Sequence, residues 1–485
     1  MNTITATIRP YMTVRWLAIP VALVALLVFA SGGPHLETWH TKTLSSEFTT
    51  KMLDEVSDFG DYLALEDRLF KELQDEIYAA TPTGTEYSLV RYSSGSLSDP
   101  NTRQPNYNRT FELSIDSPRG GVLLLHGLTD SPYSLRALGE MLNELGFWVV
   151  GLRLPGHGTV PSALEYTRWE DMAAATRLAM DHLASKVGPL PIHIAGYSNG
   201  AALALDHALA SLGDPVLPRP ASLILISPSI GVSASAALAG PIATISKTPG
   251  LGRLAWSQIT LEFDPYKYNS FPVNGGAQVR RLTQSVASRI AALAKSKKAT
   301  DFPPILVFKS AVDATVSIDA VVDRLLDRLP DNGNELVLFD INRSAVHSIL
   351  LVSDPGPITS RLMQDATLPF AITLIANAGP ASSSIVSRHK PPFTGIADQA
   401  VPLELEWPQG IISLSHVALP FSADDPLYGQ FRPQQQDVLY LGQIAIRGER
   451  GLLKLSNDWL LRLRFNPFYS VLEGRVSEWV YTNDQ

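Results

Sequence analysis

The sequence predicts an α/β fold in which a mostly parallel sheet is covered by helices on both faces. The predicted strands are continuous apolar runs, such as residues 122–125 and 222–227, rather than the alternating pattern of a half-exposed sheet. Longer helical patterns separate these strands along the chain, as they do in βαβ units. A third observation is the pentapeptide Gly196-Tyr197-Ser198-Asn199-Gly200, which places a serine between a predicted strand and a predicted helix.

Composition limits the class of protein. With 485 residues, 45% of them hydrophobic, the chain can bury a large core in one elaborated domain or in two domains. A net charge of -8 argues against a nucleic-acid partner, which would require a concentrated basic face. The sequence contains no cysteine, so disulfides, thiolate metal sites and a cysteine nucleophile are excluded.

An uncharged apolar run at residues 16–30 predicts an export or membrane segment. Arg9 and Arg15 precede the run, which places its amino-terminal side in the cytoplasm and the rest of the chain outside. We favour an uncleaved single-span anchor. A signal peptide cleaved after the small residues that follow the run is the alternative.

Residues 34–108 are expected to form an extension of the main domain. Leu65, Leu69, Leu73 and Ile77 recur at helical spacing and predict an amphipathic helix that packs against this domain. A stretch rich in Pro, Ser and Asn at 93–108 then predicts a loop between two short strands, at 86–91 and 110–114.

The strongest local signal is the turn around Ser198. A β-branched run precedes it and good helix formers follow it, which is typical of a nucleophile elbow. A serine held in a strained backbone conformation requires neighbours that lack Cβ atoms, and Gly196 and Gly200 meet this requirement. Upstream, the apolar strand at 122–125 runs directly into His126-Gly127-Leu128. Counted along the chain, the strand that leads into Ser198 is the fifth predicted strand.

An acidic partner for Ser198 is expected after the next strands. The strands at 222–227 and 304–308 are separated by a segment too long for a simple crossover, which predicts a cap over the site. Asp313 follows the second of these strands and precedes a predicted helix at 318–329. A carboxylate there can fix the tautomer of a histidine base and stabilise its protonated form.

Two histidines are candidates for the base. His347 follows the predicted strand at 335–341, at the sequence distance expected for this order of residues, but it lies in an apolar run. His416 comes after two further strand-like runs, at 370–376 and 401–407, and lies among small polar residues. The residue pattern leaves both open.

Four motifs together carry a resemblance to a known family: His126-Gly-Leu-Thr-Asp130, Leu154-Pro-Gly-His-Gly-Thr159, the pentapeptide around Ser198, and Val312-Asp-Ala-Thr-Val-Ser317. Over residues 110–345 the chain resembles bacterial carboxylesterases, monoglyceride lipases and lysophospholipases of the α/β-hydrolase superfamily. The segment 413–429 resembles the histidine loop of a membrane-associated branch, which favours His416 over His347. The long insertion before that loop departs from the family pattern.

The resemblance also implies the rest of the site. An oxyanion hole is expected from the backbone amides of Leu128 and Asn199. No cofactor or metal is expected, because His126, His157 and His193 lack metal-ligand spacing and are interpreted as structural.

The predicted organisation is an α/β-hydrolase fold with a cap inserted before the acid strand and an N-terminal membrane segment. Its expected parts are a signal anchor or signal peptide (1–33), a helical extension with a first strand (34–108), the first part of the core (109–228), the cap (229–302), and the second part of the core with the insertion (303–485). The expected location is the bacterial inner membrane, with the catalytic domain in the periplasm, or the periplasm after cleavage.

The predicted function is hydrolysis of a carboxylic ester, with a small-molecule or lipidic substrate such as a monoacylglycerol or a lysophospholipid. An acyltransferase that uses the same triad is the alternative. A non-catalytic envelope binding protein is a third reading, and it predicts that a triad residue is missing.

Overall fold

The computed structural model describes residues 34–231, 246, 251–313, 315–346, 351–352, 354–434, 438–442 and 463–484. The predicted membrane segment at 16–30 lies outside these residues. Of the helices within them, none has the length and apolar character needed to cross a bilayer.

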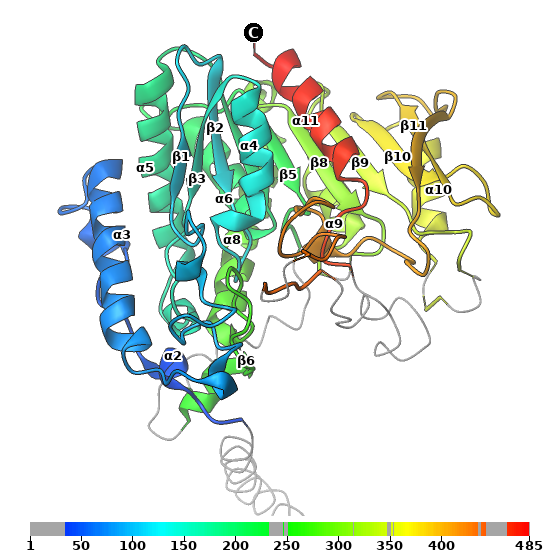
Figure 1. Cartoon of the computed structure of the whole chain (residues 1–485). Helices are drawn as coiled ribbons and strands as arrows, with labels where there is room; N and C mark the ends of the chain where they lie inside the picture. Colours follow the sequence, from blue (N-terminus) through cyan, green and yellow to red (C-terminus); the bar gives the residue numbers. More distant parts are fainter. Residues whose placement is uncertain are drawn as a thin grey trace, which may run out of the picture.

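A ten-stranded sheet forms the centre of the protein, in the order β1-β3-β2-β4-β5-β8-β9-β10-β11-β12 (Figure 1). Neighbouring strands from β3 through β10 are parallel, whereas β1, β11 and β12 pair antiparallel with their neighbours. The mostly parallel sheet is therefore confirmed. The strands are β1 (Phe111–Leu113), β2 (Gly120–Leu125), β3 (Phe147–Leu152), β4 (Ile192–Tyr197), β5 (Ser222–Ile226), β8 (Ile305–Ser310), β9 (Glu335–Phe339), β10 (Ala371–Asn377), β11 (Ser384–Lys390) and β12 (Val401–Glu406).

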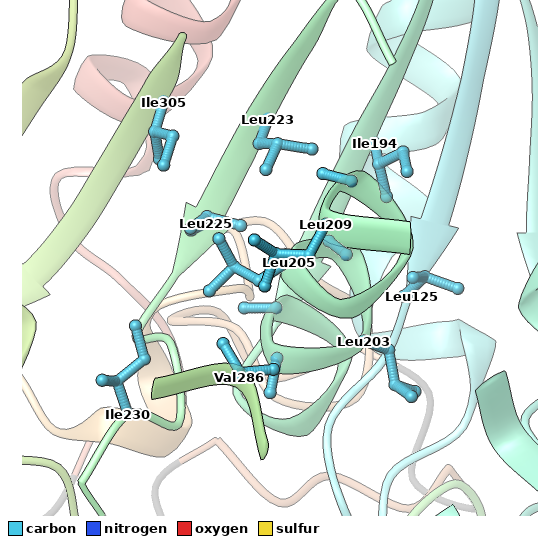
Figure 2. Packing of buried hydrophobic residues seen from close by; sticks show 14 of the residues in the cluster. Leu125, Ile194, Leu203, Leu205, Leu209, Leu223, Leu225, Ile230, Val286 and Ile305 are labelled. Atoms are coloured by element: carbon cyan, nitrogen blue, oxygen red, sulfur yellow. The ribbon is translucent and has the colours of Figure 1, made fainter. Parts of the chain in front are cut away.

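Helices cover both faces of the sheet. Leu123 and Leu125 of β2 share one core with α5 (Trp169–Val187), α6 (Asn199–Ser211) and α8 (Val273–Leu293). Val122 and Leu124 share the opposite core with α4 (Arg136–Glu144) and α11 (Tyr469–Thr482). Successive strand residues point to opposite faces, so a strand buried on both sides must be apolar throughout. Figure 2 shows how α6 packs, with Leu205 and Leu209 beside Leu223 and Leu225 of β5.

The amino-terminal extension packs against the first core. It contains α2 (Thr38–Thr41), α3 (Phe59–Leu73) and a π-helical turn at Gln74–Tyr78, and the predicted positions Leu65, Leu69, Leu73 and Ile77 are all buried. Asp58 caps α3 by accepting a hydrogen bond from the amide of Asp61 at 2.9 Å.

The strand predicted at residues 86–91 is wrong. Thr85–Tyr87 forms a 3-10 helix, and Arg91 is 1% exposed. The Arg91 guanidinium donates to the side-chain oxygen of Asn108 and to the carbonyl of Gly158, both at 3.0 Å. These tertiary contacts outweigh the local preference of Tyr87 and Val90 for a strand. The first strand is therefore β1, and the elbow follows β4, the fourth strand, rather than the fifth.

The described residues of the segment predicted as a cap lie in two places. A two-stranded sheet of β6 (Trp256–Gln258) and β7 (Phe271–Pro272) precedes α8, which belongs to the helical layer beside α6. Residues before α8 contact the turn after β2: the amide of Tyr268 donates to the carbonyl of Thr129 at 2.8 Å, and Lys267 pairs with Asp130 at 2.8 Å. A cap over the substrate stays a prediction.

The carboxyl-terminal part extends the sheet beyond β9. The helix α9 (Ile318–Arg324) follows β8, and α10 (Gly356–Gln364) precedes β10. Strand β11 has no counterpart among the predicted elements, because its residues are only partly buried and its sequence, Ser-Ile-Val-Ser-Arg-His-Lys, is largely polar. The inserted residues thus add strands to one edge of the sheet.

Candidate functional site

The turn after β4 holds Ser198 in a backbone conformation that is rare for a residue with a side chain. Its φ is 53° and its ψ is -109°, and α6 begins at the next residue. Such a conformation costs on the order of 1–3 kcal/mol and persists only where surrounding contacts enforce it. Two backbone hydrogen bonds do so here: the Ser198 amide donates to the carbonyl of Ile226 at 2.9 Å, and the Ser229 amide donates to the carbonyl of Ser198 at 3.1 Å.

Gly196 and Gly200 are required by close packing around the turn. A Cβ atom on Gly200 would lie 1.9 Å from the carbonyl oxygen of Leu125, at the end of β2. A Cβ atom on Gly196 would lie 2.6 Å from the backbone of Ala201 in α6. Both distances are shorter than any real contact, so the elbow can sit against β2 and α6 only with glycine at these positions.

The structure brings His416 to Ser198. The Nε2 atom of His416 lies 3.1 Å from Ser198 Oγ, and its Nδ1 atom lies 2.7 Å from Asp313 Oδ2. His416 is 5% exposed and begins a 3-10 helix, His416–Ala418. Its backbone carbonyl accepts a hydrogen bond from the hydroxyl of Tyr197 at 3.3 Å, which ties the histidine loop to the residue before Ser198.

Asp313 is buried and its carboxylate is hydrogen-bonded on both oxygens. Oδ1 accepts from the amides of Thr315 at 2.8 Å and Val316 at 3.1 Å, while Oδ2 accepts from His416 and from the ammonium group of Lys309. Burial alone would raise the pKa of Asp313, but the neighbouring His416 and Lys309 hold this pKa well below its ordinary value. Asp313 is therefore an ionised carboxylate next to the imidazole.

The turn after β2 lies beside the elbow, because Leu125 is paired with Gly196 in the parallel sheet. This places Leu128, three residues beyond Leu125, at the same end of the sheet as Ser198. Asn199 is the first residue of α6, and the first amides of a helix have no partner within it. In the part of the chain that the structure describes, neither the Leu128 amide nor the Asn199 amide donates a hydrogen bond to another group.

His126 fixes the shape of this turn. Its Nε2 accepts from the amide of Leu154 at 3.1 Å, which leaves the proton on Nδ1 to be donated to the carbonyl of Gly127 at 2.9 Å. Burial, reinforced by the neighbouring His157, holds the pKa of His126 well below its ordinary value. The ring is thus neutral and serves as a rigid link between the turns after β2 and β3.

The remaining predicted histidines lie elsewhere. His347 lies outside the described residues. His157 donates to the carbonyl of Pro155 at 3.0 Å, and His193 contacts the hydroxyl of Ser222 at 2.8 Å near the start of β4. Among the described residues, no three His, Asp or Glu side chains form a group that could hold a metal ion.

Two residues near Ser198 were not identified from the sequence. The hydroxyl of Ser229 lies 3.2 Å from Ser198 Oγ, and Lys309, which is 0% exposed, contacts Asp313. Ser229 gives no local signal, because it meets Ser198 only through the adjacent ends of β4 and β5. Lys309 does give a sequence signal. It directly follows the apolar run Ile-Leu-Val-Phe of a buried strand, and a lysine in such a place requires a buried partner.

Comparison with known proteins finds similarity over part of the chain. Residues 116–351 match the family described as serine aminopeptidase, S33. A thermostable monoacylglycerol lipase from Bacillus sp. (strain H-257) is 36% identical over 85 residues, which are 18% of this chain and 33% of the relative. The chain therefore spans about a third of the length of the curated relative it matches.

Solved structures are similar over about half of the chain. A monoacylglycerol lipase from Paleococcus ferrophilus is 20% identical, with a TM-score of 0.36, over 48% of this chain and 89% of that one. A soluble variant of monoglyceride lipase from Saccharomyces cerevisiae, in complex with a substrate analog, is 14% identical, with a TM-score of 0.37, over 48% and 82%. The family match over residues 116–351, which include the Ser198 elbow, agrees with the resemblance to α/β-hydrolase serine esterases that the sequence motifs predict.

Proposed function

We propose that this protein is a serine hydrolase that cleaves carboxylic esters with a triad of Ser198, His416 and Asp313. The observation that carries the proposal is the continuous hydrogen-bonded path from Ser198 Oγ through the imidazole to Asp313 Oδ2, with steps of 3.1 and 2.7 Å. A nucleophile, a base and a carboxylate that orients the base, each within hydrogen-bond reach of the next, are what acyl transfer requires.

In the first half of the reaction, Ser198 Oγ attacks the carbonyl carbon of the ester while His416 Nε2 accepts the hydroxyl proton. The ionised Asp313 stabilises the imidazolium that forms. The amides of Leu128 and Asn199 are the proposed donors to the oxyanion, and each is worth about 3–4 kcal/mol in the transition state. The tetrahedral intermediate then expels the alcohol, which takes the proton from His416 and leaves an ester on Ser198.

In the second half, His416 removes a proton from a water molecule that attacks the acyl-serine. The second tetrahedral intermediate collapses, Ser198 recovers its proton from His416, and the carboxylic acid leaves. If an alcohol takes the place of water, the same steps make a new ester, which is how an acyltransferase would use this site.

A lipidic ester, such as a monoacylglycerol or a lysophospholipid, is the substrate class we propose. The support is that the matched Bacillus protein, 36% identical over 85 residues, is a monoacylglycerol lipase. The family description also names an aminopeptidase, so an amide substrate belongs in any test.

A fluorophosphonate probe tests the mechanism directly, because it phosphonylates only an activated serine. We expect rapid labelling of the full chain and none in Ser198→Ala. His416→Ala should lower the labelling rate by about a thousandfold or more, since the base is lost. His347→Ala is the matched histidine control and should label at the wild-type rate. Labelling that survives Ser198→Ala would contradict the serine mechanism, and loss in His347→Ala but not in His416→Ala would reverse the choice of base.

Turnover then separates the candidate reactions. The full chain is supplied in turn with a monoacylglycerol, a lysophospholipid, p-nitrophenyl esters of short and long acyl chains, and an aminoacyl p-nitroanilide. Release of fatty acid from the lipids supports the proposed substrate class. Cleavage of the anilide alone contradicts the ester assignment, and formation of a new ester with an added alcohol acceptor indicates a transferase.

We also propose that residues 16–30 anchor the chain in a bacterial inner membrane, with the domain on the periplasmic side. The support is the apolar run itself and the arginines that precede it. Alkaline carbonate extraction of membranes, with protease digestion of spheroplasts, tests this. Release of the intact protein by carbonate would contradict the anchor, and an amino terminus sequenced after the run would indicate a cleaved signal.

A further inference from the structure

Lys309 is an ammonium group enclosed in the protein next to the proposed triad. It lies on β8, paired with Leu338 of β9, and none of its surface is exposed. Its Nζ atom donates to Asp313 Oδ2, four residues further along the chain. Burying a charged lysine is costly unless an opposite charge lies beside it, and Asp313 provides that charge.

The contact is made on the oxygen that also serves the base. Asp313 Oδ2 accepts from both Lys309 Nζ and His416 Nδ1, whereas Oδ1 is occupied by the amides of Thr315 and Val316. The backbone donors alone would hold the carboxylate in place. Lys309 therefore adds a positive charge to the site where a second positive charge forms when His416 is protonated.

Other polar groups among the described residues also lie near His416. Ser198 lies at Nε2, and Tyr197 donates to the His416 backbone carbonyl. Asp130, in the turn after β2, is close enough for its charge to interact with His416, but it is itself paired with Lys267. Lys309, in contrast, shares the carboxylate oxygen Asp313 Oδ2 with the base.

We propose that Lys309 is a positioning residue whose positive charge weakens the pull of Asp313 on a proton at His416. This inference rests on the proposed triad. A carboxylate favours the imidazolium and a nearby ammonium disfavours it, so the two charges oppose each other. Without Lys309 the full charge of Asp313 would act on His416, and the base would take up its proton at a higher pH.

The readout is the pH dependence of the rate of fluorophosphonate labelling of the full chain, measured from pH 4 to pH 9. The labelling rate falls on the acid side as the base becomes protonated. In Lys309→Met we expect the midpoint of this acid limb to move to higher pH by about one unit, which is a tenfold change in proton affinity. Lys309→Arg keeps the charge and should keep the midpoint of the wild type, even if the labelling rate falls.

Lys390→Met is the matched control. Lys390 is also 0% exposed, but within the described residues its ammonium donates to backbone carbonyl oxygens, those of Asp365 and Thr394 at 3.0 and 3.1 Å, and to no carboxylate. Lys390→Met should lower the free energy of unfolding without moving the midpoint of the acid limb. If Lys309→Met shows no cooperative unfolding transition, the same shift is expected in Lys309→Gln, which also removes the charge.

An acid limb that stays at the wild-type midpoint in a folded, uncharged Lys309 variant would overturn the proposal and leave Lys309 a structural residue. A limb that moves equally in Lys309→Arg would also overturn it, because the charge would then be irrelevant. The two proposals fail separately. Labelling that survives Ser198→Ala contradicts the serine mechanism, whereas an unmoved limb contradicts only the role of Lys309.

Discussion

The backbone amide of Asn342 donates to the carbonyl oxygen of Ile412 at 2.7 Å, so the chain returns to the end of β9 after the insertion that carries β10, β11 and β12. The Asn342 side chain adds a second bond, from Nδ2 to the carbonyl of Ile411 at 3.1 Å. His416 follows four residues later and reaches Ser198. The insertion therefore lengthens the sheet without displacing the histidine loop.

If this closure positions His416, Asn342→Ala should weaken both folding and catalysis. Removing a buried amide leaves its partners unsatisfied, which costs about 1–3 kcal/mol in the free energy of unfolding. We expect kcat to fall as well, because the histidine loop loses the side-chain bond to Ile411, although the backbone bond to Ile412 remains. Asn143→Ala is the control, since the Asn143 amide also bridges two carbonyls, those of Leu113 and Phe147, at 3.2 and 3.0 Å. Equal kcat in the two variants would show that the Asn342 side chain does not position His416.

Ser229 should assist the nucleophile. The Ser198 proton is directed at His416 Nε2, so the hydroxyl of Ser229 is the donor in its 3.2 Å contact with Ser198 Oγ. A neutral hydrogen bond is worth about 0.5–1.5 kcal/mol, so Ser229→Ala should slow fluorophosphonate labelling about three- to tenfold. Ser227→Ala makes the same change on the same segment, where the hydroxyl has no partner among the described residues. Equal rates in the two variants would rule out this role.

Gly200→Ala should disrupt the elbow. The added methyl group would meet the backbone carbonyl of Leu125, which cannot move without shifting β2. We expect labelling of Ser198 to be lost and the unfolding temperature to fall. At Gly474 in α11 an added Cβ atom would meet no other atom within 4 Å, so Gly474→Ala should stabilise the protein slightly, by about 0.5–1 kcal/mol. A Gly200→Ala variant that labels normally would contradict the close-packing argument.

His157 should make stability depend on pH. Burial lowers the pKa of His157 to about 4 in the folded protein, whereas the unfolded chain has the ordinary value of about 6.5. Between these values the unfolded state binds the extra proton, so this contribution to stability is complete above pH 6.5 and is lost as the pH falls toward 4. A glutamine is not protonated in this range, so the His157→Gln variant does not lose this contribution to stability as the pH falls.

The measurement for His157 is the difference in the free energy of unfolding between wild type and His157→Gln at pH 7 and pH 5. We expect the advantage of the wild type to shrink at pH 5, by up to about 1.4 kcal/mol for each pH unit below 6.5. Other titrating groups cancel in this difference. A gap that stays constant with pH would show that folding does not lower the pKa of His157.

The local parts of this site could be predicted from the sequence because each is encoded by neighbouring residues. The Ser198 elbow is a strand, a turn and a helix in one segment, and Asp313 follows directly after β8. The same reasoning failed at residues 86–91, where long-range contacts of Arg91 replace a strand, and at β11, whose polar, half-exposed residues give a weak pattern.

The sequence by itself predicts the parallel sheet, the turn that carries Ser198 and the position of Asp313 after a strand, since apolar runs and glycine spacing express them locally. Only the tertiary structure brought His416 rather than another described histidine to Ser198, because the Asn342–Ile412 closure joins residues far apart in the chain. It also placed Ser229 beside the nucleophile, through the pairing of β4 with β5. The partner of Lys309 was likewise decided by folding, since a buried ammonium needs an opposite charge and the sequence does not say which carboxylate supplies it.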